Sequence, residues 1–214
     1  MLAELDGSPS ILKEIKAGLK DSDPQVRRNL LRAMQGLDSE KLKGVIHPVA
    51  ELFADKDRYV RIQAVRVIRA AGPAGAEVLP ALINALSDER PEVIREAART
   101  INALGREQAA KALPELLELL SAGTSGLGYD TISAVSTVVT TIGEPAIPSL
   151  VELLSHDNFE TRAQSASILG RIGPGAKDAV PALTGIYQNE NEHDAARRQA
   201  YFAIEHITGE KPKL

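Results

Sequence analysis

The feature that most constrains this chain is a short motif that recurs at a nearly constant interval. It consists of a hydrophobic residue, a proline, any residue and a leucine, and its prolines are Pro80, Pro114, Pro148 and Pro181. A second motif, Asp-x-x-Val-Arg, occupies residues 23–27 and recurs one period later at 57–61. The common period is about 34 residues, and sequence periods of this length indicate a repeat architecture in which each repeat is one supersecondary unit.

Each period has the pattern of two helices. A proline suits the first helical turn, because the N–H that it lacks would have no intrahelical partner there. Glycines that follow leucine or isoleucine, such as Gly105, Gly143 and Gly173, suit the end of the second helix. Neither helix can bury its apolar face alone, so neighbouring pairs must stack on one another.

We therefore expect an all-α fold, an α-solenoid of about six helix pairs that forms a single domain over residues 1–214. The sequence leaves open whether this is a complete protein or a section of a longer array. The predicted pairs cover residues 9–36, 42–72, 77–105, 111–143, 146–173 and 177–208.

Composition excludes several function classes. The chain has no cysteine, which excludes disulfide scaffolds, cysteine zinc sites, iron–sulfur clusters and thiol catalysis. His-Glu metal motifs and the G-x-S-x-G nucleophile motif are also missing, so we predict no catalytic residues, no metal and no cofactor. Apolar runs reach only about four residues, against roughly 20 for a membrane span, and the N-terminus lacks a secretory signal pattern. We expect a cytoplasmic protein.

The motifs resemble the HEAT-like repeats of the bacterial type found in phycobilisome (bilin) lyases, and the resemblance extends over most of the chain. It implies a right-handed solenoid of a bacterial protein, with the first helices on the convex side and the second helices on the concave side. It also implies a structural ladder between the turn aspartates and arginines of successive repeats. The residues that match this ladder pattern are Asp23, Arg27, Asp57, Arg61, Arg162 and Arg197.

Two repeats depart from the ladder pattern. The third has Arg90 in the aspartate position and Ile94 in the arginine position, and the fourth has neither residue. We expect the ladder to be interrupted there.

The second helices can be aligned on one equivalent position each, which we call slot zero. The slot-zero residues are Val26, Val60, Val93, Thr131, Thr161 and Ala196. Slot eight, eight residues further on, is apolar in every repeat and should face the core. Slots two, six and nine should face solvent, and in the first three repeats they hold six arginines: Arg28, Arg32, Arg66, Arg69, Arg95 and Arg99.

These six arginines are the predicted partner-binding residues. Arginine presents a planar fork of donors that suits a carboxylate or a phosphate. Residues 1–107 hold 17 basic and 16 acidic side chains, whereas residues 108–214 hold 8 and 13, so the overall charge of −4 conceals an arginine-rich first half. The competing interpretation is a solvated helix face with local pairs, such as Glu92 with Arg95 and Glu96 with Arg99.

A possible second interface lies in the later repeats. The turn of the fourth repeat, residues 121–130, is expanded and rich in glycine, and we expect a mobile loop with Asp130 capping the next helix. The helix that follows carries no charge over residues 131–142. Phe202 occupies slot six of the last repeat, where it could join two copies in a homodimer or pack on the tail. The residues of this predicted second interface are Tyr129, Ser133, Thr137, Thr140 and Phe202.

The sequence thus favours a non-catalytic protein–protein interaction scaffold that binds an acidic, phosphate-bearing or extended partner on an arginine-lined concave face. Two alternatives remain open. The family resemblance allows a bilin or other tetrapyrrole lyase or chaperone subunit, in which the arginines would hold propionate groups. Binding of a nucleic-acid backbone is the other, although a pI near 5.7 argues against it.

Overall fold

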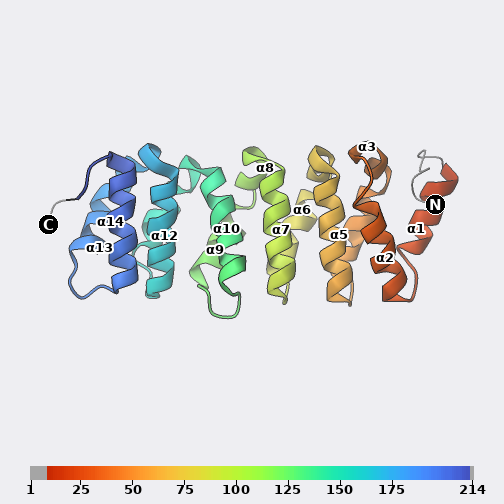
Figure 1. The fold of residues 1–214 in the computed structure, drawn as a ribbon, viewed down its shortest axis with the longest axis horizontal. Coiled ribbons are helices and arrows are strands. Elements are labelled where there is room, and N and C mark those ends of the chain that lie inside the picture. The colour runs from red at the N-terminus through yellow and green to blue at the C-terminus, as the bar shows by residue number, and fades with distance from the viewer. Residues whose placement is uncertain (1–8, 213–214) are drawn as a thin grey trace. The chain divides into compact units, whose positions relative to one another are not determined.

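The computed structural model describes residues 9–212 and is all-helical over that range, without a strand (Figure 1). The chain divides into two compact units, unit 1 (Met1–Gln108) and unit 2 (Ala109–Leu214). The division falls between the third and fourth predicted repeats. Short helix α8 (Arg106–Ala110) lies at this division. Helices in each unit alternate as the repeat pattern predicts, which makes the fold an α-solenoid.

Unit 1 contains three helix pairs. The second helices of the pairs, α2, α5 and α7, pack side by side in one layer (Figure 1). In the second and third pairs the first helix is broken into short α- and 3₁₀-segments behind this layer, whereas α1 is continuous. The elements are α1 (Pro9–Gly18), α2 (Pro24–Met34), α3 (Ser39–Leu42), η1 (Lys43–Val45), α4 (Ile46–Ala50), η2 (Glu51–Ala54), α5 (Arg58–Ala70), η3 (Gly72–Val78), α6 (Leu79–Asn84), η4 (Ala85–Ser87) and α7 (Pro91–Ala103).

Unit 2 repeats the arrangement with longer helices. Its second helices are α10, α12 and α14, and α12 packs against both of the others. The elements are α9 (Leu113–Ser121), α10 (Tyr129–Ile142), η5 (Glu144–Ala146), α11 (Ile147–Leu153), α12 (Phe159–Ile172), η6 (Gly173–Ala179), α13 (Val180–Gln188) and α14 (Asp194–Thr208).

The repeat prolines stand one residue later in their helices than the sequence pattern suggests. Helix α6 begins at Leu79, so Pro80 is its second residue, and α9, α11 and α13 also begin at the hydrophobic residue before the proline. The second position carries no penalty, because the first four N–H groups of a helix all lack intrahelical partners. At the other end, Gly143 stops α10 with φ of 73°, a conformation that favours glycine.

The slot prediction for the core is confirmed. The slot-eight side chains are all buried, namely those of Met34, Ile68, Ile101, Val139, Leu169 and Ile204. The opposite slots hold the polar residues discussed below. None of the described helices is by itself long and apolar enough to cross a membrane. One pair bent by 112°, Tyr129–Ile142 with Glu144–Leu153, meets the length and composition criteria only when taken together.

Candidate protein-binding face

An ion-pair ladder joins successive repeats, but with different carboxylates from those the family resemblance implies. Arg27 donates from Nε and Nη2 to the two oxygens of Asp55, at 2.8 and 2.9 Å, and from Nη1 to a carbonyl of its own turn. Arg61 contacts Asp88 in the same way in the next repeat. The acidic partner is therefore two residues before the predicted one, Asp57.

Asp57 has another role. It is the N-cap of α5 and accepts hydrogen bonds from the main-chain N–H groups of Tyr59 and Val60, at 2.9 and 3.0 Å. It also forms an ion pair with Arg28 of α2. Burial on its own would raise the pKa of Asp57, but the hydrogen bonds from Arg28 and the N–H groups outweigh it and lower the pKa. The Arg28 guanidinium, which also lies over the Tyr59 ring, is therefore held within the fold.

Ladder rungs are missing where the sequence predicts. Slot one of the third and fourth repeats holds Ile94 and Ile132, both buried. Among the described residues, no arginine rung starts from these two repeats, and the division between the two units lies in this interval. A rung reappears at Arg162 in unit 2. Arg197, which the pattern also assigns to the ladder, instead donates to the carbonyl oxygen of Tyr187 at 3.3 Å.

Three of the predicted arginines meet at a carboxylate that the sequence analysis left as a local helix partner. The Glu96 side chain on α7 is only 2% exposed. Arg66 and Arg69 reach it from α5, each at 3.0 Å, and Arg99 approaches from its own helix at 3.5 Å. The local pair with Arg99 does exist, and two contacts between neighbouring repeats are added to it.

The three guanidiniums keep Glu96 ionised. Burial acts to raise its pKa, but the hydrogen bond from Arg66 and the charges of Arg66, Arg69 and Arg99 outweigh burial, and the net shift lowers the pKa. Three positive charges and one negative charge leave the cluster with a net charge of +2. The arginine side chains are 36, 38 and 51% exposed, so solvent and ligands can reach them.

The remaining arginines differ in their surroundings. Arg32 is exposed at slot six of α2, and the structure gives it no hydrogen bond or ion pair within residues 9–212. Arg95 is half-buried on α7 and takes part in interactions of its own. We use the term arginine face for the accessible cationic set Arg32, Arg66, Arg69 and Arg99 of unit 1.

The predicted second interface in unit 2 is neutral. Tyr129 is 73% exposed and Phe202 is 44% exposed. Ser133 and Thr137 are exposed and Thr140 is half-buried. The hydroxyls of Thr137 and Thr140 donate to main-chain carbonyls four residues earlier, both at 2.8 Å, so their hydrogens are already used within the helix. Phe202 packs edge-to-face on Tyr201.

The loop before α10 is anchored at Thr124, whose N–H and hydroxyl both donate to Glu160 of α12, at 3.1 and 2.5 Å. The expected capping role of Asp130 is wrong. Gly128 is the N-cap of α10, and Asp130 lies in its first turn. Helix α10 therefore begins at Tyr129, two residues earlier than an N-cap at Asp130 would give.

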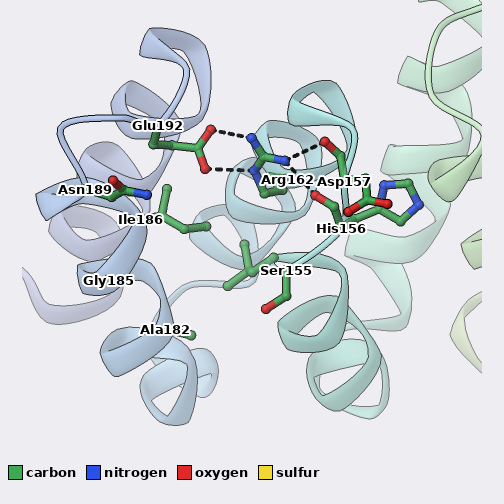
Figure 2. A pocket seen from close by; sticks show the side chains of 10 residues that line it. Ser155, His156, Asp157, Arg162, Ala182, Gly185, Ile186, Asn189 and Glu192 are labelled. Carbon is green, nitrogen blue, oxygen red and sulfur yellow. Dashed lines mark hydrogen bonds and ion pairs between the residues drawn. The ribbon is translucent and has the colours of Figure 1, made fainter.

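A cavity of 480 Å³ lies beside the Arg162 ladder rung, lined by α12, by α13 and by the turns that follow α11 and α13 (Figure 2). Arg162 donates to both oxygens of Glu192 and to the carbonyls of His156 and Asp157. Because these acceptors already use the guanidinium, the cavity offers no free cation. Within the described residues, no group of three or more histidines and acidic side chains is placed to hold a metal ion.

Sequence reasoning named Glu96 only as a helix neighbour of Arg99 and missed its contacts with Arg66 and Arg69, although a signal was present. Slot nine of one helix contacts slot three of the next: Gln35 donates to Gln63 at 2.6 Å, and Arg69 donates to Glu96. Complementary polar residues at these two slots identify the contact once the helices are aligned.

Comparison with known proteins agrees with this architecture. The family model described as HEAT repeats matches residues 45–127 and 129–205. A model described as a HEAT repeat associated with sister chromatid cohesion matches residues 2–28. No curated protein matches the chain in sequence.

Several solved structures share the fold. Computationally designed armadillo repeat proteins for modular peptide recognition align with a TM-score of 0.57 and 21% identity, covering 92% of this chain and 99% of that one. The complex of CpcE and CpcF of phycocyanin lyase from Nostoc sp. PCC7120 gives a TM-score of 0.53 and 20% identity, covering 90% and 93%. At these identities the likeness concerns the fold alone. Because the HEAT-repeat model matches well over half of the chain, the protein belongs to the HEAT-repeat family.

Proposed function

We propose that this protein is a non-catalytic scaffold that binds an acidic, extended protein partner on the arginine face of unit 1. The observation that carries the proposal is the Glu96 cluster, in which three partly exposed guanidiniums share one buried carboxylate. Each arginine keeps N–H donors that Glu96 does not use. Arg32 adds a fourth cation, which has no counter-ion among residues 9–212.

Glu96 also fixes the arginines in place before a partner arrives. A side chain held in one geometry loses little conformational entropy on binding, so more of the interaction energy appears as affinity. Carboxylates or phosphates of a partner would form charge-assisted, bidentate hydrogen bonds with such donors. The designed armadillo proteins of similar fold are described as built for peptide recognition, which agrees with an extended partner. We place this interaction in the cytoplasm of a bacterial cell, as the repeat type suggests.

The test uses a fluorescein-labelled octaglutamate peptide and fluorescence anisotropy. The triple variant Arg32→Gln, Arg66→Gln and Arg99→Gln should weaken binding by about tenfold or more, because it removes three charge-assisted contacts. Glutamine is chosen because a glutamate at position 66 would stand beside the buried Glu96 and destabilise the fold. The matched control, Lys13→Gln, Lys16→Gln and Lys43→Gln, removes the same charge from exposed positions on α1 and η1. Equal affinities for the two triple variants would overturn the proposal.

The same proteins separate the alternative functions. The absorbance spectrum of a bilin should stay unchanged when the wild-type chain is added, whereas a tetrapyrrole-handling protein would shift the bilin's absorbance. A single-stranded oligonucleotide should bind no more tightly than the peptide. If the oligonucleotide binds more tightly, with a strong dependence on salt, nucleic-acid binding becomes the better account.

We also propose Phe202 as a contact between two copies of the chain, on the ground that a large ring is exposed on α14. Sedimentation of the wild type should show association that the Phe202→Ser variant lacks. A wild-type chain that stays monomeric at high concentration would contradict this contact.

A further inference from the structure

In the second and third repeats of unit 1, the slot-three side chain accepts a hydrogen bond from the preceding second helix. The slot-nine side chain of α2, Gln35, donates to Gln63 of α5, and the slot-nine side chain of α5, Arg69, donates to Glu96 of α7. The slot-three side chains of α5 and α7 therefore have hydrogen-bond partners within the fold.

Two slot-three side chains of unit 2 lack this hydrogen bond from slot nine of the preceding second helix. These slot-three residues, on α12 and α14, are Gln164 and Gln199. The slot-nine residue before Gln164 is Thr140, whose hydroxyl donates to its own helix. The slot-nine residue before Gln199 is Gly170, where a Cβ atom would come within 2.8 Å of the Ala203 Cα.

The two amides are consequently available. Within the described part of the chain, Gln199 makes no hydrogen bond or ion pair, and Gln164 receives only a 3.5 Å contact from the Ser136 hydroxyl. Close packing of α12 on α14 therefore explains why position 170 has no side chain to reach Gln199.

A cation of unit 2 also lacks its internal counter-ion. Arg198 occupies slot two of α14, the slot that Arg28 occupies on α2. Arg28 is neutralised by Asp57, whereas exposed Arg198 has no ion pair or hydrogen bond to any residue between 9 and 212.

These unsatisfied groups border one cavity of 350 Å³ on the second-helix face of unit 2. One edge is formed by the exposed ring of Tyr129 and another by Phe159, whose ring stacks on His193 with centroids 3.7 Å apart. Glu160 also borders the cavity, and its hydrogen bonds from Thr124 lower its pKa, so it stays ionised at neutral pH. The site therefore combines two amides, one guanidinium, one carboxylate and aromatic rings.

We propose that this cavity binds an extended peptide segment that carries a single acidic side chain. A glutamine amide offers one acceptor and a pair of donors, the same groups that a peptide unit presents, so Gln164 and Gln199 can pair with successive main-chain groups. Arg198 would take the acidic side chain in a bidentate contact. Tyr129 and Phe159 supply apolar surface beside the chain.

Glu160 limits the number of acidic groups that the site accepts. Its charge disfavours a second anion in the cavity, while its free oxygen can accept a peptide N–H. This distinguishes the cavity from the arginine face of unit 1, where the net positive charge favours a polyanion. The inference concerns a separate site and does not depend on the proposed function of unit 1.

The test is an NMR titration of the ¹⁵N-labelled full chain. The probe is a blocked nonapeptide of glycine and serine with one central glutamate, and its matched control has glutamine instead. The side-chain NH₂ signals of Gln164 and Gln199, identified by their loss in the Gln164→Ala and Gln199→Ala variants, should shift with the glutamate probe. The glutamine peptide should bind roughly tenfold more weakly, because one charge-assisted contact is lost.

The decisive variant is Arg198→Gln, which should weaken binding of the glutamate peptide about tenfold. The control variant is Lys177→Gln, which removes an exposed charge on η6 and should leave binding unchanged. Main-chain spectra confirm that both variants are folded. Unmoved glutamine signals at about 5 mM probe, or equal affinities of the two variants, would overturn the inference. Shifts confined to the arginine face of unit 1 would also overturn it while leaving the proposed function intact.

Discussion

Arg66 on α5 donates to the buried carboxylate of Glu96 on α7 at 3.0 Å, and this contact ties the second helices of two successive repeats together. It has two consequences. It gives a buried charge a partner, which the fold requires. It also holds a guanidinium that is still 36% exposed, so one interaction serves both stability and ligand access.

The Glu96→Gln variant should be less stable at neutral pH by about 1–2 kcal/mol. Removing one partner of a buried ion pair is costly, but here the arginines can turn to solvent, which reduces the loss. Urea unfolding followed by circular dichroism measures the difference. Glu92→Gln, at an exposed position on the same helix, is the control and should change little. Equal unfolding midpoints for the two variants would show that the cluster contributes nothing.

The stabilisation by Glu96 should depend on pH. Its pKa is lower in the folded than in the unfolded chain, so its contribution is complete above the ordinary glutamate pKa and is lost as the pH falls through the lowered value. The gap in unfolding free energy between wild type and Glu96→Gln should therefore be constant from about pH 7 to 5 and shrink below pH 4 or so. Other carboxylates titrate in both proteins and cancel. A gap that widens in acid would contradict the assignment.

Substitution by alanine should have opposite effects on stability at two glycines of unit 2. Gly170→Ala places a Cβ 2.8 Å from the Ala203 backbone and should destabilise the protein by about 1–3 kcal/mol through overpacking. Gly185 lies in α13 with open space around it, so Gly185→Ala should stabilise by about 0.5–1 kcal/mol. Thermal unfolding of both variants checks the pair. The packing account fails if Gly170→Ala is as stable as Gly185→Ala.

Two arginines of unit 2, Arg162 and Arg198, should differ in how much they contribute to stability. Arg162→Ala removes the counter-ion of Glu192, which keeps only the His193 N–H, and the side-chain donor to two turn carbonyls, so we expect a loss of about 2–3 kcal/mol. Arg198→Ala removes no hydrogen bond or ion pair to residues 9–212 and should change stability by less than about 0.5 kcal/mol. The two urea midpoints provide the comparison, and a similar loss in both would mean that Arg198 has an internal role.

The sequence was sufficient to predict the helix pairs and the core, because both depend on the spacing of residues that are close together in the chain. The buried residues of slot eight and the exposure of Arg32 and Arg99 follow directly from helical spacing. HEAT-repeat membership followed from the same repeated motifs.

Contacts between repeats were harder to predict. Which carboxylate meets Arg27 depends on the offset between stacked helices, and that offset places Asp55 opposite it while Asp57 caps α5. Whether an arginine is accessible depends on this offset too, as Arg28 and Arg32 show. They lie four residues apart on one helix, yet within the described part of the chain only Arg28 of the two forms an ion pair with a carboxylate.

The most direct test of the arginine face is an NMR titration that observes the arginine Nε–Hε signals while octaglutamate peptide is added. Our account predicts that the signals of Arg32, Arg66 and Arg99 shift together and saturate at one concentration, while that of Arg28, held by Asp57, stays in place. Shifts at Arg28 equal to those at Arg32, or no shift at the arginine face while the peptide binds elsewhere, would contradict it.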